Sequence, residues 1–393
     1  MSKLPSSLPL PIQSVDAAER AYNVILELET RLLALSQRTE ETQTDFAQAH
    51  SSRPKLDTDL GEQRNLVLCR ILGYLLHHTP TDKARASVAE GIIACNGDDG
   101  KLLEFGEAFL SFIRFLHSNT AKTRTPPGDR FNRDLRVEDA KGSSVQPKDH
   151  WSAKKYALKR DGYRCMITGA FDAMACDQFP EILAELKDSP SGRWAVTQCS
   201  HIFAGVMNRD TDVDKSNWSA SVSTILEKFG YTCILDELQG PNVHRLENVM
   251  TLDPNIQGAF HMLRLWFAPS VSPPPLLISP PPRLLIFQRD PNAEPNTYEL
   301  EAPEPFIIKH FPKIVRFQSS DPENLPLPSP RYLEIHAAFA RIAHLAGATD
   351  YIDRIMRDLE DKTVLANDGS SGELLKHLLK QASPRERRES LEP

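Results

Sequence analysis

The stretch TQCSHIFAG, residues 197–205, decides how this chain is interpreted, because it places a histidine at the end of a strand-like segment. Residues 194–197 alternate in character ahead of it, and a period of two predicts a β-strand. His201 stands where that strand is expected to end. A histidine there is either a reactive group or an ordinary interior residue, and the remainder of the chain has to separate the two.

The composition predicts a globular protein inside the cell. The 393 residues are 40% hydrophobic, which is enough for the cores of two or three domains. The opening MSKLPSSLPLPIQ lacks the apolar core of a signal peptide, and no later segment offers the roughly 18 uninterrupted apolar residues of a membrane span. We therefore expect an intracellular protein, cytoplasmic or nuclear, without membrane contact.

The cysteines give no sign of a disulfide framework. The chain has 6 of them and no C-x-x-C pair, which also argues against a structural zinc knuckle. Cys165 and Cys199 could bind a metal together. Without a second cysteine close to either, they are interpreted as small buried hydrophobic residues.

The charge distribution leaves one local candidate for a nucleic-acid surface. The net charge of −7 and the pI near 6.0 make the whole molecule a poor match for a polyanion. Residues 121–165, however, carry 12 Lys and Arg against 6 Asp and Glu. Lys154, Lys155, Lys159 and Arg160 cluster there, and we expect them to carry any contact with nucleic acid. A solvated basic linker is the alternative.

Residues 1–120 are predicted to form a helical bundle. Apolar residues recur at spacings of three and four between residues 18 and 35, and Asp16 with Glu19 forms a capping-box start. Residues 66–76 and 102–116 are further apolar helical stretches. Such stripes pack against partners within the chain or on another protein.

Four further segments follow the bundle. They are a basic linker at residues 121–150, a mixed region at 151–328 with a proline-rich crossing at 268–283, C-terminal helices at 329–362, and a polar tail at 363–393 that is expected to be disordered. The fold class is therefore α+β.

Within residues 151–328 the pattern is strand, long insertion, strand, helix. CMITG (165–169) is a predicted strand, and ENVMTLD gives a second that ends at Asp253. Asp253 and Pro254 fit the N-cap and first position of the helix that follows. His201 ends the strand before the insertion, and Asn248 begins the strand after it.

Four motifs in this order carry a family resemblance. RDGYRCMITG, CSHI, LENVMTLD and FHMLRLWF together resemble the HNH endonuclease domain of the ββα-metal type, in a variant found in uncharacterised fungal proteins. LPLPSPRYLEIHAAFARIAHLAGATDYID is similar to the C-terminal extension of those proteins, so the resemblance covers about residues 151–360. It implies a metal-dependent endonuclease that hydrolyses nucleic-acid phosphodiesters, with His201 as general base and Asn248 as the residue that orients it.

The chemistry of phosphodiester hydrolysis fits that implication. A water must lose a proton near neutral pH, and an imidazole with a pKa of about 6.5 suits the task. The charge that develops on the phosphate calls for a hard divalent cation such as Mg²⁺. An asparagine beside the base can fix its tautomer.

Two positions depart from the family pattern. Ser200 stands where many HNH domains carry an acidic metal ligand, immediately before the general base. On the helix the pattern places a metal-binding histidine at Gln257, while His261 lies four residues further on. Gln257 and His261 are thus the two candidate metal positions, and the pattern favours Gln257.

Two functional classes remain open after this reading. The first is an active HNH-type endonuclease guided to DNA or RNA by the basic segment, and the second is a non-catalytic HNH-fold protein whose N-terminal helices bind a protein partner. Gln257 favours the second, and His201 with Asn248 favours the first. His244, His310 and His336 belong to no motif.

Overall fold

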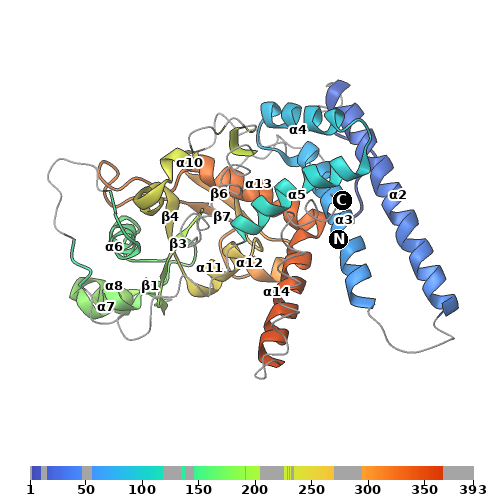
Figure 1. Cartoon of the computed structure of the whole chain (residues 1–393). Coiled ribbons are helices and arrows are strands. Elements are labelled where there is room, and N and C mark those ends of the chain that lie inside the picture. The colour runs from blue at the N-terminus through green and yellow to red at the C-terminus, as the bar shows by residue number, and fades with distance from the viewer. Residues whose placement is uncertain are drawn as a thin grey trace, which may run out of the picture.

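The computed structural model describes most of the chain and assigns it a mixture of helices and small sheets. The described residues are 2–9, 16–46, 55–117, 134–137, 146–190, 192–203, 225–227, 229, 231, 234–269 and 294–365. The architecture is α+β, as the sequence predicts, with long helices gathered at one end and short strands in the middle (Figure 1).

Four helices make up the N-terminal part: α2 (Asp16–Phe46), α3 (Lys55–His78), α4 (Asp82–Ala94) and α5 (Asp99–Leu116). They include the three predicted helical stretches, which are confirmed. Thr81 and Asp98 cap α4 and α5 by accepting hydrogen bonds from backbone N–H groups of the first turn. Gly106 lets α5 approach α3 closely, because a Cβ there would lie 2.9 Å from the Leu68 carbonyl oxygen.

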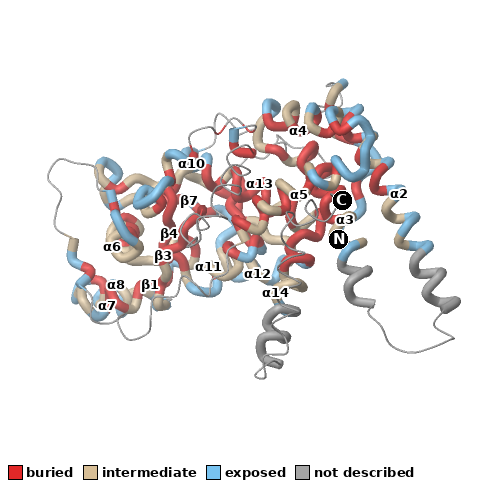
Figure 2. Tube along the Cα trace, viewed as in Figure 1, coloured by how far each residue is buried: buried red, intermediate tan, exposed pale blue. Residues whose placement is uncertain are grey.

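The N-terminal helices share one core with the C-terminal ones. Helix α13 (Pro330–Ala346) packs on α3 and α5, and α14 (Ala348–Leu365) follows it after Gly347, whose φ of 77° ends α13. The rings of Phe112 and Phe339 meet edge to face with centroids 4.5 Å apart. Figure 2 shows buried positions running from α3 and α5 through α13 to β3 and β4.

The centre of the fold is an antiparallel strand pair followed by a short helix. Strand β3 (Gln198–His201) pairs with β4 (Val249–Leu252), and His201 lies opposite Val249. Helix α11 (Pro254–His261) begins directly after β4, because the Asp253 side chain accepts a hydrogen bond from the Asn255 N–H. The predicted strand before Asp253 and the helix start at Pro254 are both confirmed.

Smaller elements surround this centre. They are α6 (His150–Arg160), β1 (Phe171–Asp172), α7 (Ala173–Gln178), α8 (Pro180–Asp188), β2 (Trp194–Ala195), α10 (Ile234–Glu237), η4 (Gly240–His244), η5 (Leu246–Asn248), β5 (Trp266–Pro269), β6 (Thr297–Glu301), α12 (Pro305–Ile308) and β7 (Ile314–Arg316). Strands β1 and β2 pair in parallel, and β5, β6 and β7 form an antiparallel sheet beside α13.

The prediction of a strand at CMITG (165–169) is wrong. Residues 165–169 form a tight turn, in which the Gly169 N–H donates to the Cys165 carbonyl and Gly169 has a φ of 67°. The Cys165 sulfur accepts hydrogen bonds from Thr168 N and Asp253 N, so the turn is tied to the start of α11. Apolar residues face the core here without a strand ladder.

Several predicted segments lie wholly or partly outside the described residues. These are most of the linker at 121–150, nearly all of the proline-rich crossing at 268–283, and the tail from residue 366. Helix α6 begins at His150, within the predicted linker, and α14 extends to Leu365. Among the described helices, none combines the length and apolar character needed to cross a membrane.

Burial of His336 predicts a pH dependence of folding. Its ring stacks on Phe260 of α11 with centroids 3.8 Å apart, and burial lowers its pKa to about 3. In the unfolded chain the His336 imidazole is protonated below about pH 6.5, whereas in the native state it is protonated only near pH 3. This residue therefore leaves the free energy of unfolding unchanged above about pH 6.5 and lowers it as the pH falls towards 3. We expect a loss of about 3 kcal/mol from this residue between pH 6.5 and 4.

The test replaces His336 with phenylalanine, which keeps a flat ring against Phe260. Urea unfolding at a series of pH values should show a shallower pH dependence for His336→Phe than for wild type. A residual slope belongs to the other buried histidines, because burial also lowers the pKa values of His77, His78, His150, His201 and His261. Equal slopes for the two proteins would contradict the assignment.

Candidate functional site

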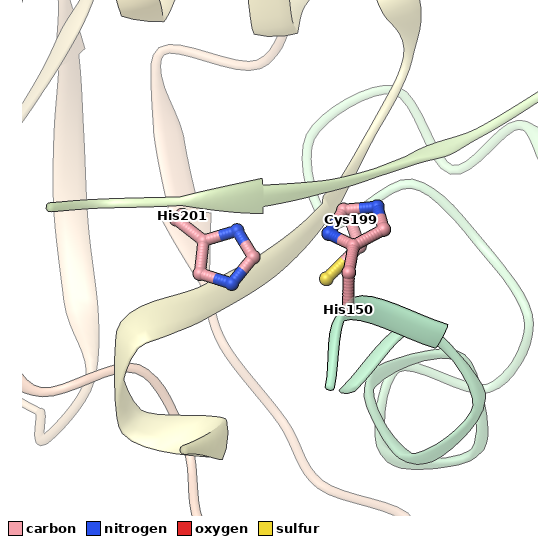
Figure 3. A group of neighbouring side chains, drawn as sticks. All are labelled: His150, Cys199 and His201. Carbon is pink, nitrogen blue, oxygen red and sulfur yellow. The ribbon is translucent and has the colours of Figure 1, made fainter. Parts of the chain in front are cut away.

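His201 lies at the buried end of β3 and shares one face of the strand with Cys199. Only 1% of His201 and 3% of Cys199 are exposed. Because successive side chains of a strand point to opposite faces, Cys199 and His201 lie on one side and Ser200 on the other. The two side chains on the first face point towards the start of α6 (Figure 3).

Helix α6 covers that face of β3. Its Ala153 and Ala157 pack against Cys199, and small residues there let the helix approach the strand. The first residue of α6 is His150, whose place is fixed by a capping box between Asp149 and Ser152. The rings of His150 and His201 consequently stack with centroids 5.5 Å apart and 26° between their planes (Figure 3).

A third imidazole completes a group that we call the histidine cluster: His150, His201 and His244. His244 ends η4, and its Nδ1 lies 3.2 Å from Nε2 of His201, within hydrogen-bond distance. The rings of His150 and His244 have centroids 6.5 Å apart. Three histidines that are far apart in the sequence therefore surround the end of β3.

Burial keeps this cluster neutral at physiological pH. Desolvation holds the pKa of His201 well below its ordinary value, and the neighbouring imidazoles add to the effect. Burial also lowers the pKa of His150 to about 4. The pKa of His244 is lowered by burial as well, while nearby Asp149 acts in the opposite direction. Neutral imidazoles carry one free lone pair each, which can accept a proton or bind a metal.

Asn248 positions the cluster through the backbone. Its side chain is completely buried, its Oδ1 accepts a hydrogen bond from the Phe203 N–H at 3.0 Å, and its Nδ2 donates to the Val243 carbonyl at 2.9 Å. The first contact fixes the chain just after His201, and the second fixes the turn that carries His244. The imidazole of His201 was expected to meet the Asn248 side chain, and in the structure it meets His244 instead.

The opposite face of β3 holds a separate polar pair. The Ser200 hydroxyl and Nε2 of His261 on α11 lie 2.9 Å apart, and both residues are buried. Gln257 lies one helical turn earlier and is half-buried. Of the two candidate metal positions on the helix, His261 is thus the one in contact with the residue that precedes His201.

One group of metal-ligand side chains emerges from the described residues. His150, Cys199 and His201 each offer one donor atom, and these atoms all lie within 4.8 Å of one another. Mg²⁺ prefers oxygen ligands in octahedral geometry, so this set does not fit the ion implied by the family resemblance. Imidazole and thiol donors fit ions of the zinc class.

The predicted nucleic-acid surface needs one correction. Arg160 is 1% exposed, and its guanidinium bonds to Asp161 and to backbone carbonyls, so it is not available to a phosphate. Local basic composition suggested a surface position, but α6 turns this residue inward. Lys154, Lys155 and Lys159 are half-buried on the same helix, and the Lys154 ammonium donates to the Thr197 carbonyl.

Sequence reasoning missed His150 and His244. The spacing of Cys199 and His201 was a usable signal, because residues two apart on a strand share a face. His150 and His244 reach them only through packing of α6 and η4, which no local pattern reveals. Comparison with known proteins finds no matching family model, curated protein or solved structure.

Proposed function

We propose that this chain is an HNH-like phosphodiesterase that acts on nucleic acid, with His201 as the general base. One observation carries the proposal: β3 pairs antiparallel with β4, α11 follows at once, and His201 stands at the end of β3. This is the strand, strand and helix order that the family resemblance implies. The order also explains why a histidine occupies a rigid strand end.

The His201 imidazole is neutral, as a base must be before it takes a proton, although the burial that lowers its pKa also makes it a weaker base than an exposed imidazole. With its Nε2 proton donated to Nδ1 of His244, its own Nδ1 retains a lone pair that can take a proton from water. The water oxygen then forms the new bond to phosphorus, the bond to the leaving oxygen breaks, and that oxygen takes a proton from solvent. Asn248 holds the chain segments that carry both imidazoles.

Helix α6 links this centre to three half-buried lysines. It carries His150 at its first position and Lys154, Lys155 and Lys159 further along. Residues 121–165 have an excess of six positive charges while the whole chain is negative, so this segment is where we expect a polyanion to be attracted. Binding that relies on a few lysines weakens strongly with salt.

Burial of His201 favours a second candidate function. His201 is only 1% exposed, and the group of donor side chains around it contains no carboxylate. Both observations also fit a non-catalytic protein that uses the same fold to bind a protein partner. In that case the polar groups at β3 serve stability and metal binding alone. The two candidates differ in whether phosphodiester bonds are cut.

A cleavage assay separates the candidates. The full-length chain is incubated with supercoiled plasmid and with single-stranded RNA, in separate reactions with Mg²⁺, Mn²⁺, Co²⁺, Zn²⁺ or a chelator. We expect cleavage of at least one substrate with at least one ion, and none with the chelator. If the folded protein cuts neither substrate under any condition, the phosphodiesterase proposal is overturned and the non-catalytic candidate is supported.

A further inference from the structure

Three side chains beside β3 could together bind a metal ion, a capacity that the proposed function does not use. His150, Cys199 and His201 present two imidazoles and a thiol from two elements, with donor atoms within 4.8 Å of one another. We propose that they bind one divalent ion of the zinc class, with the Cys199 sulfur as a thiolate. This site differs from the one expected on α11, and it takes His201 as a ligand.

The donor separations suit such an ion after a small adjustment. Zinc bonds of about 2.3 Å to sulfur and about 2.0 to 2.1 Å to nitrogen place donors of a tetrahedral site about 3.3 to 3.6 Å apart. The present separations reach no more than 4.8 Å, so side-chain movements of about 1 Å bring the three donors to bonding distance. Cys199 and His201 are fixed by the β3–β4 ladder, and His150 stands at a helix start where its side chain can turn.

The surroundings support a bound ion as well. His244 lies against His201 and can hydrogen-bond its second ring nitrogen, which fixes the tautomer of a ligating histidine. All three donors are uncharged in the absence of metal. The Cys199 thiol in particular is fully buried, and burial raises its pKa to about 12. An ion would convert it to a thiolate, and one proton would be released to solvent for each ion bound.

Occupancy of this site has a consequence for His201. An imidazole lone pair that binds a metal cannot also take a proton from water. Zinc-class ions should therefore suppress any cleavage that depends on His201, while Mg²⁺, which does not fit the donor set, should not. This consequence rests on the proposed phosphodiesterase, whereas the metal site itself does not.

The experiment follows cadmium bound to the full-length, metal-free chain. Cd²⁺–thiolate bonds absorb in the ultraviolet, so titration with Cd²⁺ reports a cysteine ligand directly. We expect one strongly bound Cd²⁺ per chain, displaced by Zn²⁺ and unaffected by excess Mg²⁺. Cys199→Ala should lose this absorption, and Cys176→Ala, which also removes a buried thiol, should retain it.

His150→Ala provides a second variant at a half-buried position, where folding is less at risk. It should keep the thiolate absorption but bind Cd²⁺ at least roughly tenfold more weakly, since even residues that only support a ligand typically cost that much. Circular dichroism checks that each variant is folded. The proposal is overturned if wild type shows no thiolate absorption, if Cys199→Ala retains it, or if His150→Ala binds as tightly as wild type.

The two proposals can fail separately. If the protein cleaves no substrate with any ion, the phosphodiesterase proposal is overturned, and the Cd²⁺ result is unaffected. Cleavage without any thiolate absorption would end the metal site alone. In an active protein, Cys199→Ala should cut in the presence of Zn²⁺ at concentrations that inhibit wild type, because it keeps the His201 imidazole and loses the competing ligand.

Discussion

Replacement of His201 by alanine should lower the rate of phosphodiester cleavage by about 100- to 10,000-fold, the usual contribution of a general base. The expected loss is large because His201 is the imidazole that the β3 strand holds rigidly, with His244 fixing its tautomer. The measurement is the initial rate of plasmid or RNA cleavage, with the ion that best supports wild type.

Two control variants show whether the loss of cleavage rate in His201→Ala is specific to the His201 imidazole. Cys176→Ala removes a buried thiol on α7, outside the candidate site, and leaves the His201 imidazole, so its rate should stay close to wild type. His310→Ala removes an exposed histidine and controls for contaminating nucleases. If His201→Ala cuts as fast as these two proteins, His201 is not the base.

Arg160→Met should destabilise the folded chain by about 3 to 5 kcal/mol, because it leaves a buried carboxylate without its partner. The Arg160 guanidinium pairs with Asp161 at 2.7 Å, and both side chains are at most 1% exposed. It also donates to the carbonyls of Leu246 and Val249 at 2.8 and 2.9 Å. Methionine fills a similar volume, so the loss reports charge and hydrogen bonds rather than a cavity.

Lys155→Met on the same helix is the control, since Lys155 is half-buried and its replacement should change stability little. Urea unfolding at pH 7 compares the three proteins. Equal midpoints for Arg160→Met and Lys155→Met would show that the buried pair does not stabilise the fold. If a folded Arg160→Met protein bound nucleic acid more weakly than wild type, Arg160 would contact nucleic acid after all, which its burial in this structure excludes.

Local patterns were sufficient for the elements that carry the candidate base. The Asp253–Pro254 helix start and the apolar spacing of residues 18–35 each depend on neighbours in the sequence, and each corresponds to an observed element. His201 ends a strand as predicted, but the alternation at residues 194–197 falls on β2 and on the break between β2 and β3. Such signals come from backbone periodicity and capping, which act within a few residues.

The side-chain environment could not be obtained in the same way. His150 and His244 join His201 because α6 and η4 pack beside β3, and Arg160 turns inward because carbonyls of η5 and β4 lie there. The turn at residues 165–169 replaces a strand for a related reason, since its backbone bonds to Thr251 and its cysteine sulfur accepts from Asp253. These outcomes depend on contacts between distant parts of the chain.

The stack of His336 on Phe260 limits how the chain can be divided for experiments. Phe260 lies on α11, next to the candidate site, and His336 lies on α13, which also packs against α3 and β5. A fragment that ended at residue 328 would strip this cover from α11 and open an apolar face to water. The strand pair, α11 and the long helices are therefore best regarded as one cooperative unit, and the proposed activity is best tested on the whole chain.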